Sequence, residues 1–106
     1  MMEWSIHPSA QQEHDEWIEY FGGIDEELAI AFELRYLENR HRICSNPELH
    51  RVRRGKTRRV NLHPRFGEYY IAYMIWREKI VILAIAHAKR RPYYWSKRIS
   101  ESKKLF

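Results

Sequence analysis

The stretch that decides the fold is YYIAYMIWREKIVILAIAH, residues 69–87. Its two halves, residues 69–76 and 79–87, are rich in β-branched and aromatic side chains, as β-strands are. Only Arg77 and Glu78 separate the halves, which predicts a tight antiparallel hairpin. Side chains alternate between the two faces of a strand, and apolar residues occupy nearly every position here. Both faces of this hairpin are therefore apolar.

Upstream of the hairpin, the periodicity predicts a short strand and two helices. Trp4–His7 alternates as a strand does. Apolar side chains then recur at helical spacing from Ser9 to Phe21 and again from Asp25 to Asn46, which indicates two antiparallel helices. The stripe that packs on the second helix is expected to include Leu34 and Leu37.

Residues 51–54 and 57–62 flank Gly55 and Lys56 and are predicted to form a further hairpin. The element order is then β-α-α-β-β-β-β. This order indicates an α+β fold in which a two-helix hairpin packs on one face of a small, mostly antiparallel sheet. The 106 residues fit one domain, residues 1–106, and the basic tail at 96–106 is expected to be flexible.

Two helices on one side of the sheet would cover only one of the two apolar faces. The other face would then expose an apolar patch of the kind that marks a binding surface. We assign Tyr69, Ile71, Tyr73 and Ile75 to this surface and expect a partner to cover it. Two alternatives remain: the C-terminal tail folds back over that face, or the strand is central and its far side is only half exposed.

Charge is divided unevenly along the chain. Residues 1–50 contain 3 Lys/Arg and 11 Asp/Glu, whereas residues 51–106 contain 16 and 3, so the two parts carry net charges of −8 and +13. The positive field of the second part attracts polyanions such as nucleic acid, a machine that carries nucleic acid, or an acidic peptide. The alternative is a solvated basic face that serves solubility.

Several classes of protein are not favoured by the composition. The longest apolar run, residues 80–86, is too short to cross a bilayer, and the N-terminus lacks the layout of a signal peptide, so we expect a cytosolic protein. The single Cys44 cannot form an internal disulfide. The histidines outside residues 87–95 show no spacing with carboxylates typical of a zinc site, and no glycine-rich phosphate loop is present. We therefore expect neither a metal nor a cofactor.

Residues 87–95, HAKRRPYYW, concentrate an imidazole, three cations and three aromatic rings at the end of a predicted strand. Arginine binds phosphates, aromatic rings stack on bases, and a histidine with a near-neutral pKa can transfer a proton. The segment thus resembles an RNA-cleaving site. Alternatively, His87 is a buried sheet residue, Pro92 fixes a turn and Trp95 packs at the edge of the core.

A basic zone precedes the long hairpin. Arg58 and Arg59 are neighbours on a strand, so their side chains point to opposite faces and only one can enter a given groove. Each of these cations alone is more often a solvated surface charge, and the cluster carries the prediction. The candidates for binding a target or a nucleic acid are Arg53, Arg54, Lys56, Arg58, Arg65, Arg91, Tyr93 and Trp95.

Three pieces of the chain carry a family resemblance. They are Trp4–Ala10 as an opening strand and helix start, Arg58–Leu62 as a central strand, and a closing His-x-x-Arg-x-Pro-x-Tyr-Trp pattern at residues 87–95. Together they resemble the RelE/ParE superfamily of toxins from type II toxin–antitoxin systems, over nearly the whole chain. One departure is FGEY at residues 66–69, where family members often carry Phe-Pro-Tyr.

The resemblance implies a microbial-RNase-like fold and a cognate antitoxin whose extended or helical C-terminal segment covers the toxin. An amphipathic, acidic segment would suit both the basic part of the chain and the apolar face, with Tyr69, Ile71, Tyr73 and Ile75 as the contact surface. It also implies that the complex represses the operon that encodes both proteins. ParE-like members block DNA gyrase, and RelE-like members cut messenger RNA in the ribosome. The closing pattern is common among ParE-like and plasmid-stabilisation members, which favours a gyrase inhibitor.

The enzymatic alternative assigns roles to four residues. In a RelE-like nuclease, His87 or Tyr94 would transfer protons, and Arg59 and Arg90 would stabilise the charge on the phosphate. In a gyrase inhibitor, the same cations and aromatic rings would contact protein or DNA without proton transfer. A non-toxic module that binds nucleic acid is a third alternative.

Overall fold

The predicted hairpin forms the centre of the sheet. In the computed structural model, which describes residues 1–106, β3 (Phe66–Trp76) and β4 (Lys79–His87) pair antiparallel. Arg77 and Glu78 join them with φ angles of 51° and 64°, the left-handed conformation that a tight hairpin turn requires at both central positions.

Two further strands extend the sheet. β2 (Arg58–Leu62) pairs antiparallel with β3, and β1 (Trp4–Ile6) pairs parallel with β4, which gives the order β1-β4-β3-β2. The single parallel pair follows from the connection between β1 and β4, which passes through both long helices.

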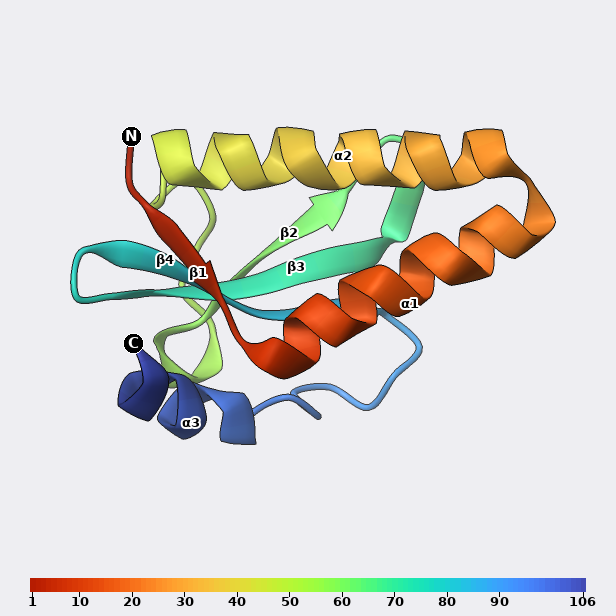
Figure 1. The fold of residues 1–106 in the computed structure, drawn as a ribbon. Coiled ribbons are helices and arrows are strands. Elements are labelled where there is room, and N and C mark those ends of the chain that lie inside the picture. Colours follow the sequence, from red (N-terminus) through yellow and green to blue (C-terminus); the bar gives the residue numbers. More distant parts are fainter.

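Helices α1 (Pro8–Ile24) and α2 (Glu26–Ser45) form an antiparallel pair, and a shorter α3 (Lys97–Leu105) closes the chain (Figure 1). Asp25 separates the long helices because its side chain accepts a hydrogen bond from the Glu27 N–H, 3.0 Å away, and so caps α2. None of the three helices combines the length and the apolar character needed to cross a membrane.

One face of the sheet packs under α1 and α2 and contains the larger part of the core. Aromatic rings from both helices meet aromatic rings of β3 there, with Phe21 and Phe32 both in contact with Phe66. The α+β class and the two-helix hairpin on one face of a mostly antiparallel sheet are thereby confirmed.

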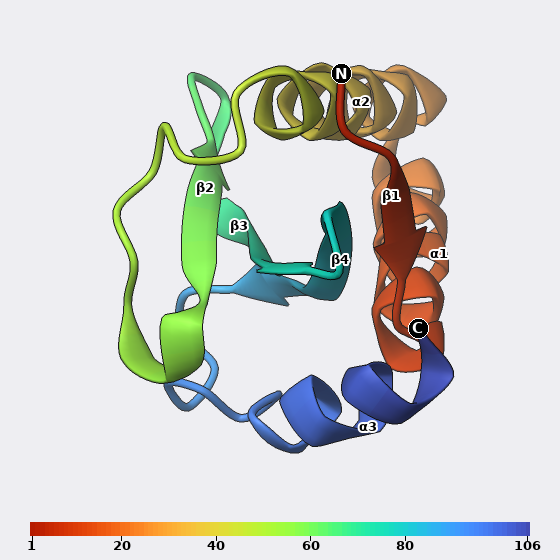
Figure 2. The ribbon, with the colours of Figure 1, turned by 90° about the vertical axis from the view of Figure 1, so that its left-hand side faces the viewer.

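The prediction of an uncovered apolar face is wrong, because both faces of the hairpin are covered. The face opposite the long helices is buried by the segment around Trp95 and by α3 (Figure 2). Ile99 of α3 and Phe106, the residue after this helix, pack there. The tail is largely polar, and its nine-residue helix contains four cations. The sequence signal for this helix is the helical spacing of Ile99, Ser102 and Phe106. The alternative in which the tail folds back is confirmed.

The residues assigned to that surface lie on the other face. Ile71 and Tyr73 are fully buried under α1 and α2, and Tyr69 and Ile75 pack against the same core. Alternation along β3 sends odd-numbered residues toward the helices, so these four side chains are not available to a partner.

Three further expectations need correction. The tail at 96–106 is helical rather than flexible over residues 97–105. Residues 51–54 form no strand, since Gly55 and Lys56 adopt left-handed φ angles within a 3-10 turn, η1 (Arg54–Lys56), that turns the chain immediately before β2. Leu34 and Leu37 are 55% and 37% exposed, because the packed side of α2 is the one that carries Phe32 and Tyr36.

The two apolar faces make a testable prediction about Leu83, which is fully buried on the α3 side of the sheet. Replacing Leu83 by Ala should lower the free energy of unfolding by about 2–5 kcal/mol, through lost burial and a residual cavity. Urea denaturation measures this change. Leu105→Ala, at a side chain 57% exposed, is the control and should stay within about 0.5 kcal/mol of the wild type. Equal stabilities of the two variants would contradict the covered face.

Candidate functional site

A basic cavity opens on the α3 side of the sheet, between β2 and the closing segment. We call it the arginine–aromatic pocket; its volume is roughly 240 Å³. It is lined by Arg53, Thr57, Arg58, Arg59, Tyr70, Pro92, Tyr93 and Trp95. Strand alternation explains its position, because Arg59 and Tyr70 point to the face opposite α1 and α2.

Aromatic rings hold two of the arginines at this pocket. The Arg59 guanidinium lies 4.0 Å from the centroid of the Tyr70 ring, and Arg54 lies 4.5 Å from that of Tyr93. The Tyr70 hydroxyl in turn accepts a hydrogen bond from the Trp95 indole N–H, 3.1 Å away. Stacked guanidinium groups keep their in-plane N–H groups available for an anion. The pocket is therefore suited to a phosphate or a carboxylate.

The neighbouring cation Arg58 is held differently. Its guanidinium donates a hydrogen bond to the carbonyl of His50, 2.6 Å away, in the loop that follows α2. The prediction that only one of Arg58 and Arg59 enters a given groove is wrong, because both line the arginine–aromatic pocket. Their partners differ: Arg58 anchors the loop after α2, and Arg59 stacks on Tyr70.

The structure brings together most of the predicted binding residues. Four of them line the pocket, namely Arg53, Arg58, Tyr93 and Trp95. Arg54 lies beside the pocket, where its guanidinium stacks on the ring of Tyr93. Lys56 and Arg91 are exposed and adjoin the lining residues Thr57 and Pro92 in the chain. Arg65 does not belong to this group, because it lies in the β2–β3 turn over the ring of Phe66.

Sequence reasoning missed Tyr70 as a pocket residue. Tyr70 lies within a run of apolar and aromatic residues in β3. Nothing in that run distinguishes the ring that stacks on a guanidinium from the rings that pack in the core. The pairing of Asn61 with Tyr70 places the ring beside Arg59, and this register is set by the sheet rather than by local sequence.

A second cavity lies on the opposite side of β4, between α1 and the closing segment. This histidine pocket has a volume of roughly 250 Å³ and is lined by Glu13, Glu16, Trp17, Tyr20, Ile85, His87, Arg90 and Tyr94. The His87 ring packs edge-on against Tyr69, with 4.7 Å between ring centroids, and its Nε2 lies 3.3 Å from a carboxylate oxygen of Glu68. Its Nδ1 accepts a hydrogen bond from the Lys89 N–H.

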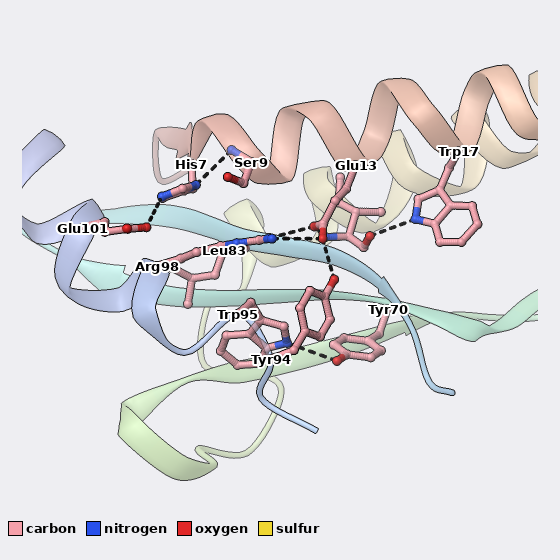
Figure 3. Close-up of polar contacts among 11 residues, drawn as sticks. His7, Ser9, Glu13, Trp17, Tyr70, Leu83, Tyr94, Trp95, Arg98 and Glu101 are labelled. Carbon is pink, nitrogen blue, oxygen red and sulfur yellow. Dashed lines mark hydrogen bonds and ion pairs between the residues drawn. The ribbon is translucent and has the colours of Figure 1, made fainter. Parts of the chain in front are cut away.

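A half-buried carboxylate organises the floor of the histidine pocket (Figure 3). Glu13 accepts hydrogen bonds from the Tyr94 hydroxyl at 2.5 Å and from the Ile85 backbone N–H at 3.1 Å. Arg98 binds both oxygens of the same carboxylate, at 2.8 and 3.2 Å. Burial raises the pKa of the Tyr94 hydroxyl well above its usual range, and the hydrogen bond to Glu13 and its charge raise it further. Tyr94 is thus held as a neutral hydrogen-bond donor.

The four residues assigned to nuclease chemistry are divided between the two cavities. His87, Arg90 and Tyr94 line the histidine pocket, whereas Arg59 lines the arginine–aromatic pocket. The Tyr94 hydroxyl is occupied by Glu13, and the Arg90 guanidinium stacks 4.1 Å from the centroid of the Tyr94 ring. The proton-transfer groups and the Arg59 cation therefore do not face one phosphate.

No group of three or more His, Cys, Asp or Glu side chains is arranged to hold a metal ion. No protein-family model matches the chain, and no curated protein matches its sequence.

The Glu13 cluster predicts a large effect for a small change. Glu13→Gln removes the charge that compensates Arg98, whose side chain is only 16% exposed, and should lower the free energy of unfolding by about 2–3 kcal/mol. The residual exposure of both partners keeps the loss below that of a fully buried pair. Chemical denaturation measures it, with the exposed neighbour Glu16→Gln as the matched control within about 0.5 kcal/mol of the wild type. A neutral Glu13→Gln would show that the cluster does not stabilise the fold.

The raised pKa of Tyr94 predicts a loss of stability at alkaline pH. In the unfolded chain the hydroxyl releases its proton near pH 10, whereas the folded protein retains it to higher pH. The contribution is fully present below pH 10, and the free energy of unfolding should fall as the pH rises above that value. Tyr94→Phe should show a shallower fall in denaturation experiments across this range. Part of the fall should remain, because burial also raises the pKa of Tyr73 to about 12. Identical slopes would contradict the assignment.

Proposed function

We propose that this chain is the toxin of a type II toxin–antitoxin pair, a ParE-like growth inhibitor in the cytosol that acts on DNA gyrase by binding. The observation that carries the proposal is the composition of the arginine–aromatic pocket. Its lining includes three arginines and three aromatic residues but no carboxylate and no imidazole. Such a lining favours the capture of an anionic group over acid–base catalysis, for which a group that titrates near neutral pH is the usual agent.

The division of the nuclease residues supports the same proposal. A phosphate bound beside Arg59 would lie in a different cavity from His87, and the Tyr94 hydroxyl is committed to Glu13. Gyrase holds DNA while it works, so the anionic group would be a DNA phosphate or an acidic side chain of the enzyme. The resemblance of the closing pattern to ParE-like members favours this target over the ribosome.

The partner in the proposal is an antitoxin with an acidic C-terminal segment. Since Tyr69, Ile71, Tyr73 and Ile75 are covered by the protein's own helices, we place the antitoxin on the basic surface around the arginine–aromatic pocket instead. An acidic segment bound there would neutralise the same cations that engage the target, which would explain inhibition by simple competition.

A RelE-like messenger RNA nuclease is the second candidate. The observation in its favour is that three arginines and the Tyr93 ring border one cavity, which suits a phosphate beside a stacked base. The third candidate, a non-toxic nucleic-acid-binding module, would use the same pocket without arresting growth.

The proposal predicts different outcomes for the two cavities. The double variant Arg53→Ala/Arg59→Ala should abolish growth arrest on induced expression and inhibition of purified gyrase in a plasmid-topology assay, because it removes two of the three arginines that line the pocket. His87→Ala should leave both readouts within about twofold of the wild type, since a bound inhibitor needs no proton transfer. Arg77→Ala, an exposed arginine in the distant β3–β4 turn, is the matched control.

A ribosome-dependent messenger cleavage assay runs beside the gyrase assay. Cleavage of messenger by the wild type, with loss of arrest in a folded His87→Ala chain, would replace the proposal by the nuclease candidate. If neither gyrase nor messenger is affected and growth continues, the non-toxic module takes its place.

A further inference from the structure

The arginine–aromatic pocket carries more positive charge than a single phosphodiester can neutralise. Arg53, Arg58 and Arg59 all line it, and none of the three forms an ion pair within the chain. The chain supplies no acid close to them in sequence, since residues 49–67 and 79–100 contain neither Asp nor Glu. The mutual repulsion of these cations is therefore left for a ligand to offset.

The same three guanidinium groups keep N–H donors that the protein does not use. Arg58 donates to the carbonyl of His50 through one terminal nitrogen, and Arg59 donates through its Nε to the Asn61 side chain, 3.3 Å away. No hydrogen bond within the chain involves their remaining nitrogens or any of those of Arg53. Several charged donors are thus free at one cavity, and they can bind more than one anionic group.

A buried hydroxyl adds a neutral donor to this set. Tyr70 is 4% exposed, and its oxygen accepts the Trp95 indole N–H (Figure 3). The proton of this hydroxyl has no acceptor within the chain, so it is available to an anion. The cavity, at roughly 240 Å³, is smaller than the roughly 300–1,000 Å³ of pockets that enclose drug-sized ligands. A compact anion of high charge suits it better than a whole nucleotide.

We propose that the arginine–aromatic pocket binds a condensed phosphate, the di- or triphosphate group that occurs free or at the end of a nucleotide, in preference to a single phosphodiester. Neighbouring phosphates of a nucleic-acid strand are separated by a sugar, so only one of them would enter the cavity. Condensed phosphates share a bridging oxygen and bring two or three anionic groups into the same volume. The planar fork of arginine binds such oxygens in pairs.

The inference rests on the anion-binding role that the proposed function gives to this pocket. It adds a ligand that would occupy the same cations and so compete there with the target. The histidine pocket offers an internal comparison, because it also contains a stacked arginine, Arg90. Its lining includes the carboxylates of Glu13 and Glu16, which repel phosphate. The condensed phosphate is therefore expected at the arginine–aromatic pocket alone.

Isothermal titration calorimetry of the purified chain, at fixed ionic strength and without divalent cations, tests the preference. Pyrophosphate and tripolyphosphate should bind about tenfold or more tighter than inorganic phosphate, because each added phosphate gains charge-assisted hydrogen bonds. Citrate carries a comparable charge spread over a carbon skeleton and should bind no tighter than inorganic phosphate. Equal affinities for citrate and tripolyphosphate would reduce the effect to general charge attraction and overturn the proposal.

Nucleotides separate the two sources of the condensed phosphate. AMP should bind as weakly as inorganic phosphate, and ATP should bind much more tightly than AMP. ATP binding tighter than tripolyphosphate supports the proposal with a nucleotide as the source, whereas the reverse order supports it with a free condensed phosphate. AMP binding as tightly as ATP would show that one phosphate is sufficient and would overturn the proposal.

Three variants locate the site, with circular dichroism to confirm that each is folded. Arg53→Ala should weaken tripolyphosphate binding about tenfold or more. Arg59→Lys keeps the charge but loses the planar fork, so it should also weaken binding. Arg65→Ala is the matched control, because it removes the same charge from an exposed position outside the pocket and should stay within about twofold of the wild type. Equal losses in Arg53→Ala and Arg65→Ala would overturn the assignment to this pocket.

The gyrase assay keeps this inference distinct from the proposed function. Gyrase inhibition by a chain that does not bind condensed phosphate would overturn the inference and leave the proposed function in place. Condensed-phosphate binding by a chain that does not inhibit gyrase would do the opposite.

Discussion

The Glu13 carboxylate is the interaction on which the rest of this structure depends. β1 pairs with β4 only as far as Ile82, so the end of β4 has no neighbouring strand on that edge. Helix α1 covers the edge instead: Glu13 accepts the Ile85 N–H, and the Trp17 indole donates to the Ile85 carbonyl at 2.9 Å. Side chains of a helix thus satisfy backbone groups that would otherwise invite another strand.

The same carboxylate attaches the C-terminal part of the chain. Arg98 and Tyr94 bind Glu13 from α3 and from the segment before it, and a second contact joins His7 to Glu101 at 2.9 Å. These polar contacts set α3 across the second apolar face of the hairpin, where Ile99 packs. A tail rich in polar and charged residues therefore becomes a structural layer, because its Arg98 pairs with a half-buried acid on α1.

Covering both faces of the sheet has a consequence for function. The apolar side chains of the central hairpin pack in the protein's own core. The feature left for recognition is the group of cations held on aromatic rings at the β2 side. The acidic N-terminal part forms β1, α1 and α2, and the basic part forms the remaining strands and α3. Charge that is divided along the sequence is therefore also divided between the elements, and the basic helix α3 lies on the opposite side of the sheet from α2 (Figure 2).

The sequence by itself determined the hairpin at residues 69–87, both long helices and the α+β class, because periodicity and turn residues are local properties of the chain. The sequence also identified Arg59, Tyr93 and the cations close to them as candidate site residues. Only the tertiary structure decided which face of β3 is covered by which element, since apolar and aromatic side chains occupy both faces of this strand and the choice depends on where α3 docks. It likewise decided that Arg59 and His87 open into different cavities: the two residues lie on strands separated by β3, and the sheet register, with Tyr69 opposite His87 and Tyr70 opposite Asn61, turns them to opposite sides.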